Sequence, residues 1–259
     1  MPVDNDVYDR HGEGWWDEDN PLNILHGSMT PGRFAYFSEV LRQRRRLDPT
    51  GVRALDIGCG GGFMAEEFAR LGCHVVGVDP SAVSIETARR HAVATGLDID
   101  YRVAFGERLP VADGGFDVAY ACDVLEHVAD LGAVMSEVAR VLAPSGVFFF
   151  DTINRTRTSR LLGIKVMQEW RMTRFIDAAL HDWDMFITPA ELTEALGRSG
   201  LLVEEVVGLG PRSSRPRVLL DFVRANRGSI SYGELSRRLD VGQVASTNIS
   251  YMGFATKAG

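Results

Sequence analysis

Residues 52–62 read V-R-A-L-D-I-G-C-G-G-G, and this stretch decides the fold that we expect for the 259-residue chain. Its first half is mostly apolar, which is typical of a buried strand, and glycine stands at positions 58, 60, 61 and 62. Glycine tolerates turns that other residues do not. Because residues 63–71 read as a helix, the glycines lie between a strand and a helix N-terminus, where backbone N–H groups and the helix dipole favour an anionic ligand group.

A second predicted strand, residues 73–78, leads into Asp79, which lies 21 positions after Gly58. In doubly wound folds an acidic residue at about this distance accepts hydrogen bonds from ribose hydroxyls. The two features together predict an adenosine-containing ligand, either a dinucleotide or S-adenosylmethionine. The predicted cofactor contacts in these two segments are the following: Asp56, Gly58, Cys59, Gly60, Asp79 and Pro80.

The composition, 45% hydrophobic and 24% charged, suits one large α/β domain over residues 1–259. A net charge of −7 argues against nucleic acid as a partner. The three cysteines lie in separate elements without a C-x-x-C pair, which indicates a reducing compartment. Without an apolar leader or a run of transmembrane length, we expect a cytoplasmic protein.

Seven strands and several helices are expected along the chain. The strands are expected at 52–57, 73–78, 99–103, 116–122, 147–153, 201–207 and 249–255, and the helices at about 34–46, 63–71, 81–95, 130–142, 189–199, 217–226 and 231–239. Residues 1–50 form an N-terminal cap in this reading. Within it, the adjacent Trp15 and Trp16 need an apolar surface and either cover the core or roof a ligand pocket.

Ligands of open α/β sheets bind beyond the carboxyl ends of the strands. The strand at 116–122 runs into D-V-L-E-H-V at 123–128, so this loop is the predicted catalytic edge. A turn here would place Asp123, Glu126 and His127 on one face. His127 would then serve as a general base, or the three side chains would hold a divalent cation such as Mg²⁺. The alternative is an ordinary helix start.

Two further segments carry polar or charged clusters. His181 opens H-D-W at 181–183, which is either a second part of the catalytic site or a loop packing motif. Residues 154–187 form a basic insertion, in which 155–174 contain six cations and one acidic residue among apolar side chains. Such a segment is typical of an interfacial membrane helix, and a lid over the site would look the same.

The string L-D-I-G-C-G-G-G at 55–62 resembles the first motif of class I S-adenosylmethionine-dependent methyltransferases. V-L-E-H-V at 124–128, H-D-W at 181–183, F-I-T-P-A-E-L at 186–192 and S-Y-M at 250–252 resemble, more specifically, the O-methyltransferases of ubiquinone biosynthesis. The resemblance spans nearly the whole chain. It implies a Rossmann-like seven-stranded sheet with an antiparallel last strand, S-adenosylmethionine as donor and polyprenylated phenols or catechols as acceptors.

The resemblance also implies site residues. Arg33, Gly58, Asp79 and Val124 would line the cofactor site, together with Cys122 at the end of the fourth strand. Many methyltransferases bind the adenine amino group through an aspartate where this chain has Phe105, so adenine would contact the backbone of Gly106 and Glu107 instead. The family metal site contains a glutamate where this chain has Asp123. The family further implies that the insertion contacts anionic membrane lipid.

Three other functions stay open at the level of the sequence. The acceptor could be a hydroxyl of a specialised metabolite, because residues 210–247 depart from the family pattern. The chain could also be a catalytically silent cofactor-binding protein that docks on membranes, or a nicotinamide oxidoreductase. The sequence does not predict an oligomeric state.

Overall fold

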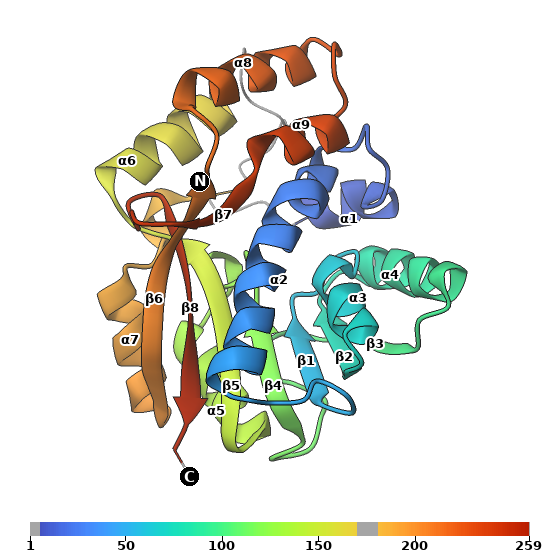
Figure 1. Cartoon of the computed structure of the whole chain (residues 1–259), viewed down its shortest axis with the longest axis vertical. Coiled ribbons are helices and arrows are strands. Elements are labelled where there is room, and N and C mark those ends of the chain that lie inside the picture. The colour runs from blue at the N-terminus through green and yellow to red at the C-terminus, as the bar shows by residue number, and fades with distance from the viewer. Residues whose placement is uncertain (1–5, 170–180, 259) are drawn as a thin grey trace.

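The computed structural model describes residues 6–169 and 181–258, and within them the strands form one eight-stranded sheet in the order β3-β2-β1-β4-β5-β8-β6-β7 (Figure 1). The strands are β1 (Arg53–Ile57), β2 (His74–Asp79), β3 (Ile99–Val103), β4 (Phe116–Ala121), β5 (Leu142–Ile153), β6 (Leu201–Pro211), β7 (Val241–Val244) and β8 (Ser250–Lys257). Strands β1 to β5 pair in parallel, and β8 runs antiparallel between β5 and β6. The predicted α/β fold with an antiparallel last strand is confirmed.

The strand β7 is one more than the seven that we expected. Strand β6 extends to Pro211, four residues beyond its predicted end, so its edge has backbone groups left to pair. Strand β7 pairs antiparallel with this extension, from Gly208 opposite Val244 to Pro211 opposite Val241. Its four residues, V-G-Q-V, are too few to show a strand period in the sequence.

Helices cover both faces of the sheet. On one face α2 (Thr30–Glu39), α3 (Phe63–Arg70) and α4 (Ala82–Thr95) share a core with Tyr120 and Phe149. On the other face α5 (Leu131–Val141) and α7 (Pro189–Arg198) pack with Phe148 and Phe150. Burial on both sides explains the apolar run V-F-F-F at 147–150 in the central strand β5.

Capping residues set the helix boundaries much as predicted. The Thr188 side chain and Glu191 form a capping box at the start of α7, with Pro189 at the first helical position. Helix α4 starts after Ser81, whose side chain accepts from the Ser84 N–H, and ends at Gly96 in a left-handed conformation. Helix α2 begins four residues before the predicted position and continues as a π-helical segment, η4 (Val40–Arg44).

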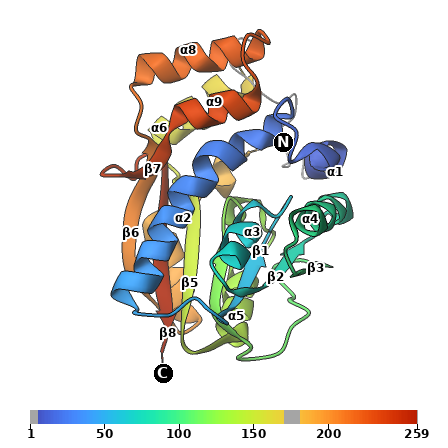
Figure 2. The ribbon, with the colours of Figure 1, turned by 45° about the vertical axis from the view of Figure 1, so that its right-hand side comes forward.

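A helical layer lies beyond the carboxyl ends of the parallel strands, at the upper end of the molecule in Figures 1 and 2. Its helices are α1 (Val7–His11), α6 (Arg157–Ser159), which continues as the π-helix η6 (Arg160–Glu169), α8 (Arg215–Asn226) and α9 (Tyr232–Leu239). Shorter turns are η1 (Gly12–Gly14), η2 (Pro21–Asn23), η3 (Leu25–Met29), η5 (Leu125–His127) and η7 (Trp183–Met185). The part of the predicted basic insertion at 170–180, with Arg171 and Arg174, lies outside the described residues. No helix in 6–169 or 181–258 is long and apolar enough to cross a membrane.

Candidate active site

The glycine loop after β1 adopts the backbone that its sequence predicts. Gly58, Gly60 and Gly62 have φ angles of 73°, 50° and 88°, which lie in the left-handed region. A Cβ atom at Gly58 would lie 2.2 Å from Cγ2 of Val124, so the loop packs directly on the chain that follows β4. Glycine is therefore required at position 58 both by the backbone and by this close approach.

Asp79 stands at the tip of β2, next to the glycine loop. The Gly60 N–H donates to Asp79 Oδ2 and the Ser81 N–H donates to Oδ1, both at 2.9 Å. Burial raises the pKa of Asp79 to about 6, although these two hydrogen bonds favour the carboxylate. The side chain is thus fixed at the place where a ribose-binding acid is expected.

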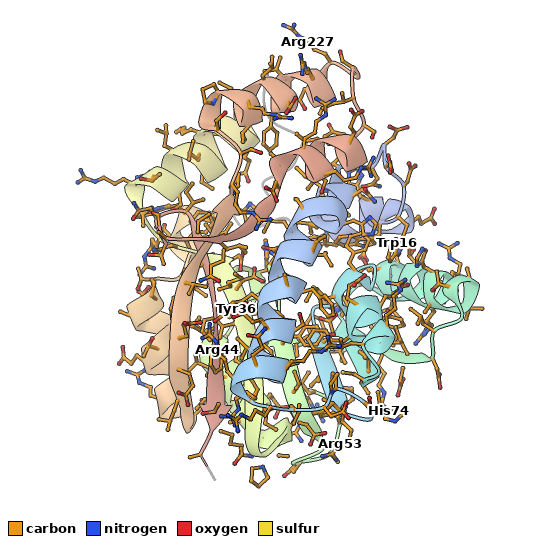
Figure 3. All side chains as sticks on the ribbon, in the orientation of Figure 1. Trp16, Tyr36, Arg44, Arg53, His74 and Arg227 are labelled. Atoms are coloured by element: carbon orange, nitrogen blue, oxygen red, sulfur yellow. The ribbon has the colours of Figure 1, made fainter. Side chains whose placement is uncertain are left out.

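The two tryptophans of the N-terminal segment cover the glycine loop. A Cβ atom at Gly61 would lie 2.4 Å from Cβ of Trp15, and Trp16 Nε1 donates to the Gly61 carbonyl at 2.9 Å. Trp16 also stacks on His91 with ring centroids 3.4 Å apart, and Figure 3 shows it where the N-terminal segment meets α3 and α4. Trp15 also belongs to a buried apolar cluster with Leu22 and Phe63, so the pair covers part of the core as well as the predicted cofactor loop.

Tyr8, in α1, is a site residue that the sequence analysis missed. Its hydroxyl lies 3.5 Å from Nε2 of His127, and its ring meets the His127 ring edge-on at 5.9 Å between centroids. Burial raises the pKa of Tyr8, and the nearby charges of Asp123, Glu126 and Asp79 raise it further. Tyr8 therefore lies near both Asp79, the predicted ribose-binding acid, and the loop after β4. A single tyrosine in an acidic segment gives no sequence signal of such a role.

Arg33 joins α2 to the catalytic edge through two carboxylates. Its Nη2 lies 2.5 Å from Asp123 Oδ2, and its Nε lies 2.8 Å from Asp151 Oδ2. Burial alone would raise the pKa of Asp123, but the Arg33 charge outweighs it and holds that pKa below the usual value. Burial raises the pKa of Asp151 to about 7. Asp151, in the middle of the apolar run of β5, is the second residue that the sequence analysis missed.

Three potential metal ligands come together in the same region as the Arg33–Asp123–Asp151 cluster. Ligand atoms of Glu126, His127 and His181 all lie within 4.8 Å of one another. The sequence analysis placed Asp123 in this set, whereas the structure brings His181 into it and pairs Asp123 with Arg33. We refer to Glu126, His127 and His181 as the ligand triad.

Hydrogen bonds hold two members of the ligand triad, Glu126 through its side chain and His181 through its backbone. The Thr152 hydroxyl donates to Glu126 Oε2 at 2.7 Å, while Glu126 Oε1 is buried with no hydrogen-bond partner in the described parts of the chain. The His181 N–H donates to the Gln168 side chain at 2.9 Å, and that amide donates back to the His181 carbonyl at 3.1 Å. This reciprocal pair joins η6 of the basic insertion to His181, the member of the ligand triad that the same insertion contributes.

The electrostatics of the ligand triad favour neutral imidazoles. Burial lowers the pKa of His127 to about 3 and that of His181 to about 4. Burial and the neighbouring Asp123 raise the pKa of Glu126 to about 8. A neutral imidazole is the form that binds a metal ion, and a buried carboxyl oxygen without a partner is a suitable third ligand.

The other predicted cofactor residues lie along the same edge of the sheet. Asp56 lies in β1 and is 2% exposed. Burial raises the pKa of its carboxyl group well above the usual value. Burial also raises the thiol pKa of Cys59 and Cys122, so both thiols stay protonated. Glu107 Oε1 accepts from the Ala129 N–H at 3.0 Å, and the contact of its backbone with adenine stays a prediction. Pro80 and Gly106 follow β2 and β3 at this edge.

Comparisons with known proteins show the family to which the chain is related. A family model described as "Methyltransferase domain" matches residues 55–150. A "Ubiquinone biosynthesis O-methyltransferase" of Methylobacterium sp. strain 4-46 is 38% identical over 208 residues, which cover 78% of this chain and 82% of that protein. The protein of the same name from Azorhizobium caulinodans is 39% identical over 208 residues, with 78% and 81% covered.

The fold is also found among solved structures. A putative sarcosine dimethylglycine methyltransferase from Galdieria sulphuraria superposes with a TM-score of 0.58 over 87% of this chain and 85% of that chain. Its sequence is 15% identical, so this likeness shows the fold alone.

Proposed function

Because the chain belongs to the family of the ubiquinone biosynthesis O-methyltransferases and uses S-adenosylmethionine, we propose that its acceptor is a hydroxyl of a phenol or catechol with a polyprenyl tail. The observation that carries this proposal is the ligand triad beside the predicted cofactor site. Two neighbouring hydroxyls of a catechol are well suited to bind a cation held there.

Methyl transfer from a sulfonium needs little from the protein beyond alignment of the acceptor, which positioning can promote by several kcal/mol. A phenolic hydroxyl has a pKa of about 10, so its deprotonation is the remaining obstacle. His127 is a weak base for this step, because its pKa is about 3. A divalent cation, when bound, lowers the pKa of a hydroxyl that it contacts.

The residues present fit such a cation. Glu126 offers a buried oxygen that lacks a hydrogen bond in the described residues, and two neutral imidazoles face it. Imidazole nitrogen suits Zn²⁺ and similar transition metals, whereas Mg²⁺ prefers oxygen ligands. With His181 in place of Asp123, we propose Zn²⁺ or a related ion rather than the Mg²⁺ named from the sequence.

The basic insertion supports a lipophilic acceptor. Arg157, Arg160 and Lys165 lie on α6 and η6 together with Leu161, whose side chain is 54% exposed. A basic segment with an exposed apolar side chain suits anionic lipid. We propose that the protein works in the cytoplasm at the inner face of the membrane, with the insertion both contacting lipid and closing the site through Gln168 and His181.

Methylation of a matched pair of acceptors tests the proposal. The protein is incubated with methyl-labelled S-adenosylmethionine and either a polyprenylated catechol or the same ring without a tail, and mass spectrometry detects the gain of one methyl group. We expect the tailed catechol to gain the label faster. Preference for the tail-free ring would favour a specialised metabolite, and no transfer to either ring would contradict the proposal.

Membrane contact of the insertion has a test of its own. We expect vesicles that contain phosphatidylglycerol to pull down the protein in a salt-sensitive way, and replacement of Arg155, Arg157 and Arg160 by glutamate to abolish this. Equal recovery of both proteins would reduce the insertion to a lid.

A further inference from the structure

Helix α8 (Arg215–Asn226) exposes two neighbouring leucines to solvent. Leu219 and Leu220 are 50% and 49% exposed, and on the helix Leu220 lies on the side opposite to Phe222 and Ala225, with Leu219 at the edge between the two sides. Phe222 and Ala225 are buried in the core on the other side. The helix therefore packs on the protein through the side that carries Phe222 and Ala225, while about half of each leucine side chain faces solvent.

Arginines flank these two leucines in the sequence. Residues 212–227 contain five arginines and one acidic residue, in a chain whose net charge is −7. The acidic residue, Asp221, is 2% exposed and accepts from Arg224 at 3.3 Å and from Arg238 at 3.2 Å, so it points to the protein. Figure 3 shows Arg227 projecting from the end of α8, away from the rest of the molecule.

The position of α8 relates it to the basic insertion. Figures 1 and 2 both show α8 and α6 at the same end of the molecule, beyond the carboxyl ends of the parallel strands. Leu161 on the insertion is 54% exposed, close to the values for Leu219 and Leu220. Two segments about 50 residues apart in sequence thus present arginines and exposed leucines at the end that carries the predicted active site.

We propose that α8 is an interfacial helix that docks on the surface of an anionic lipid bilayer. Exposed leucines beside arginines, on a helix of 12 residues that is too short to span a bilayer, match the pattern of helices that lie in the membrane interface. The positive charge is complementary to anionic headgroups. A stable protein interface buries about 800 Å² on each partner, which is far more than two half-exposed leucines supply.

This inference rests on the proposed function in one respect: the polyprenylated acceptor is the reason why the enzyme would bind a membrane. Docking through α8 and α6 would hold the end of the molecule with the ligand triad toward the bilayer, where a polyprenylated acceptor resides. The insertion alone would leave the orientation on the bilayer free, whereas two separated contacts restrict it. Helix α8 thus orients the molecule, and its loss changes lipid binding without changing any residue of the active site.

Vesicle sedimentation tests the inference. The double variant Leu219→Ser/Leu220→Ser is compared with the wild type on phosphatidylcholine vesicles with and without phosphatidylglycerol. Docking would bury the exposed halves of the two leucines, which together equal about one whole leucine side chain. Without this burial we expect affinity for anionic vesicles to fall by roughly tenfold to a hundredfold. The matched control is Leu202→Ser, because Leu202 is 59% exposed on β6 and lies outside the helical layer.

The outcomes separate this inference from the proposed function. If the α8 variant binds as the wild type does while the glutamate variant of the insertion loses binding, the inference is wrong and the membrane contact of the insertion stands. If the wild type binds no vesicle, both are wrong. If Leu202→Ser loses as much affinity as the α8 variant, the effect is not specific and the inference is again wrong.

A second measurement does not depend on the fold of the double variant. An environment-sensitive fluorophore on Leu220→Cys should shift to shorter wavelength when anionic vesicles are added. The same fluorophore on Leu202→Cys should not shift. An unchanged spectrum at position 220 under conditions in which the protein sediments with vesicles would overturn the inference.

Discussion

Replacement of Arg33 by methionine should be among the most destabilising single changes at the site. The Arg33 side chain is 3% exposed and contacts Asp123 at 2.5 Å and Asp151 at 2.8 Å. Methionine keeps much of the volume and removes the charge. The variant therefore leaves two carboxyl groups close together without the cation that neutralises them.

The expected loss follows from burial. Removing one partner of a buried ion pair costs about 3–5 kcal/mol, because the other charge stays buried without compensation. Burial already holds the pKa of Asp151 at about 7, so in the variant this carboxyl group takes up a proton at neutral pH. We therefore expect a loss near the lower end, about 3 kcal/mol, which a domain of ordinary stability survives.

Urea unfolding followed by circular dichroism measures this loss. Arg44→Met is the matched control, because Arg44 is 39% exposed where it pairs with Glu205 and should contribute less than about 1 kcal/mol (Figure 3). A raised carboxyl pKa in the folded state favours folding at low pH, so the Arg33→Met deficit should shrink as pH falls below about 7 and grow above it. Adding Asp151→Asn should restore part of the loss. A loss below about 1 kcal/mol for Arg33→Met, or no recovery in the double variant, would refute this account of the Arg33–Asp123–Asp151 cluster.

Three further predictions concern the cofactor and the ligand triad. Titration calorimetry should show that affinity for S-adenosylhomocysteine falls by up to about tenfold from pH 7 to pH 5. The reason is that Asp79, with a pKa of about 6, is protonated at pH 5. The control variant Asp79→Asn should show no such change. His181→Ala should abolish Zn²⁺ binding but keep cofactor binding, whereas His74→Ala, an exposed histidine far from the helical layer in Figure 3, should leave both intact. Tyr8→Ala should speed dissociation of S-adenosylhomocysteine by about tenfold in stopped-flow tryptophan fluorescence, because it removes a buried ring from the roof, and Tyr8→Phe should not. Identical rates for the two Tyr8 variants would contradict a roof role of the ring.

Much of the fold could be predicted from local sequence signals. The glycine loop at 58–62 and the acid at Asp79 report a local backbone geometry, and the caps at Ser81, Thr188 and Gly96 report helix ends. Strand β7 could not be predicted in the same way. It exists because β6 is long enough to leave an edge, and that length is a property of the folded sheet.

The candidate site shows the same division. Glu126 and His127 adjoin in sequence, so their proximity was predictable. That His181 joins them while Asp123 turns to Arg33 depends on contacts between segments far apart in sequence. Asp123 has a φ of 54°, an uncommon conformation for a residue with a side chain, and the Arg33 contact compensates for it.

The most direct test of the account is whether the ligand triad faces the methyl group of the bound donor. Mn²⁺, which is paramagnetic, is added to the protein with S-adenosylmethionine carrying a ¹³C-labelled methyl group, and the methyl resonance of the bound cofactor is recorded. The account predicts strong broadening of this resonance in the wild type. In His181→Ala the broadening should disappear and the resonance should stay sharp. A methyl resonance that stays sharp while Mn²⁺ is bound would contradict the account.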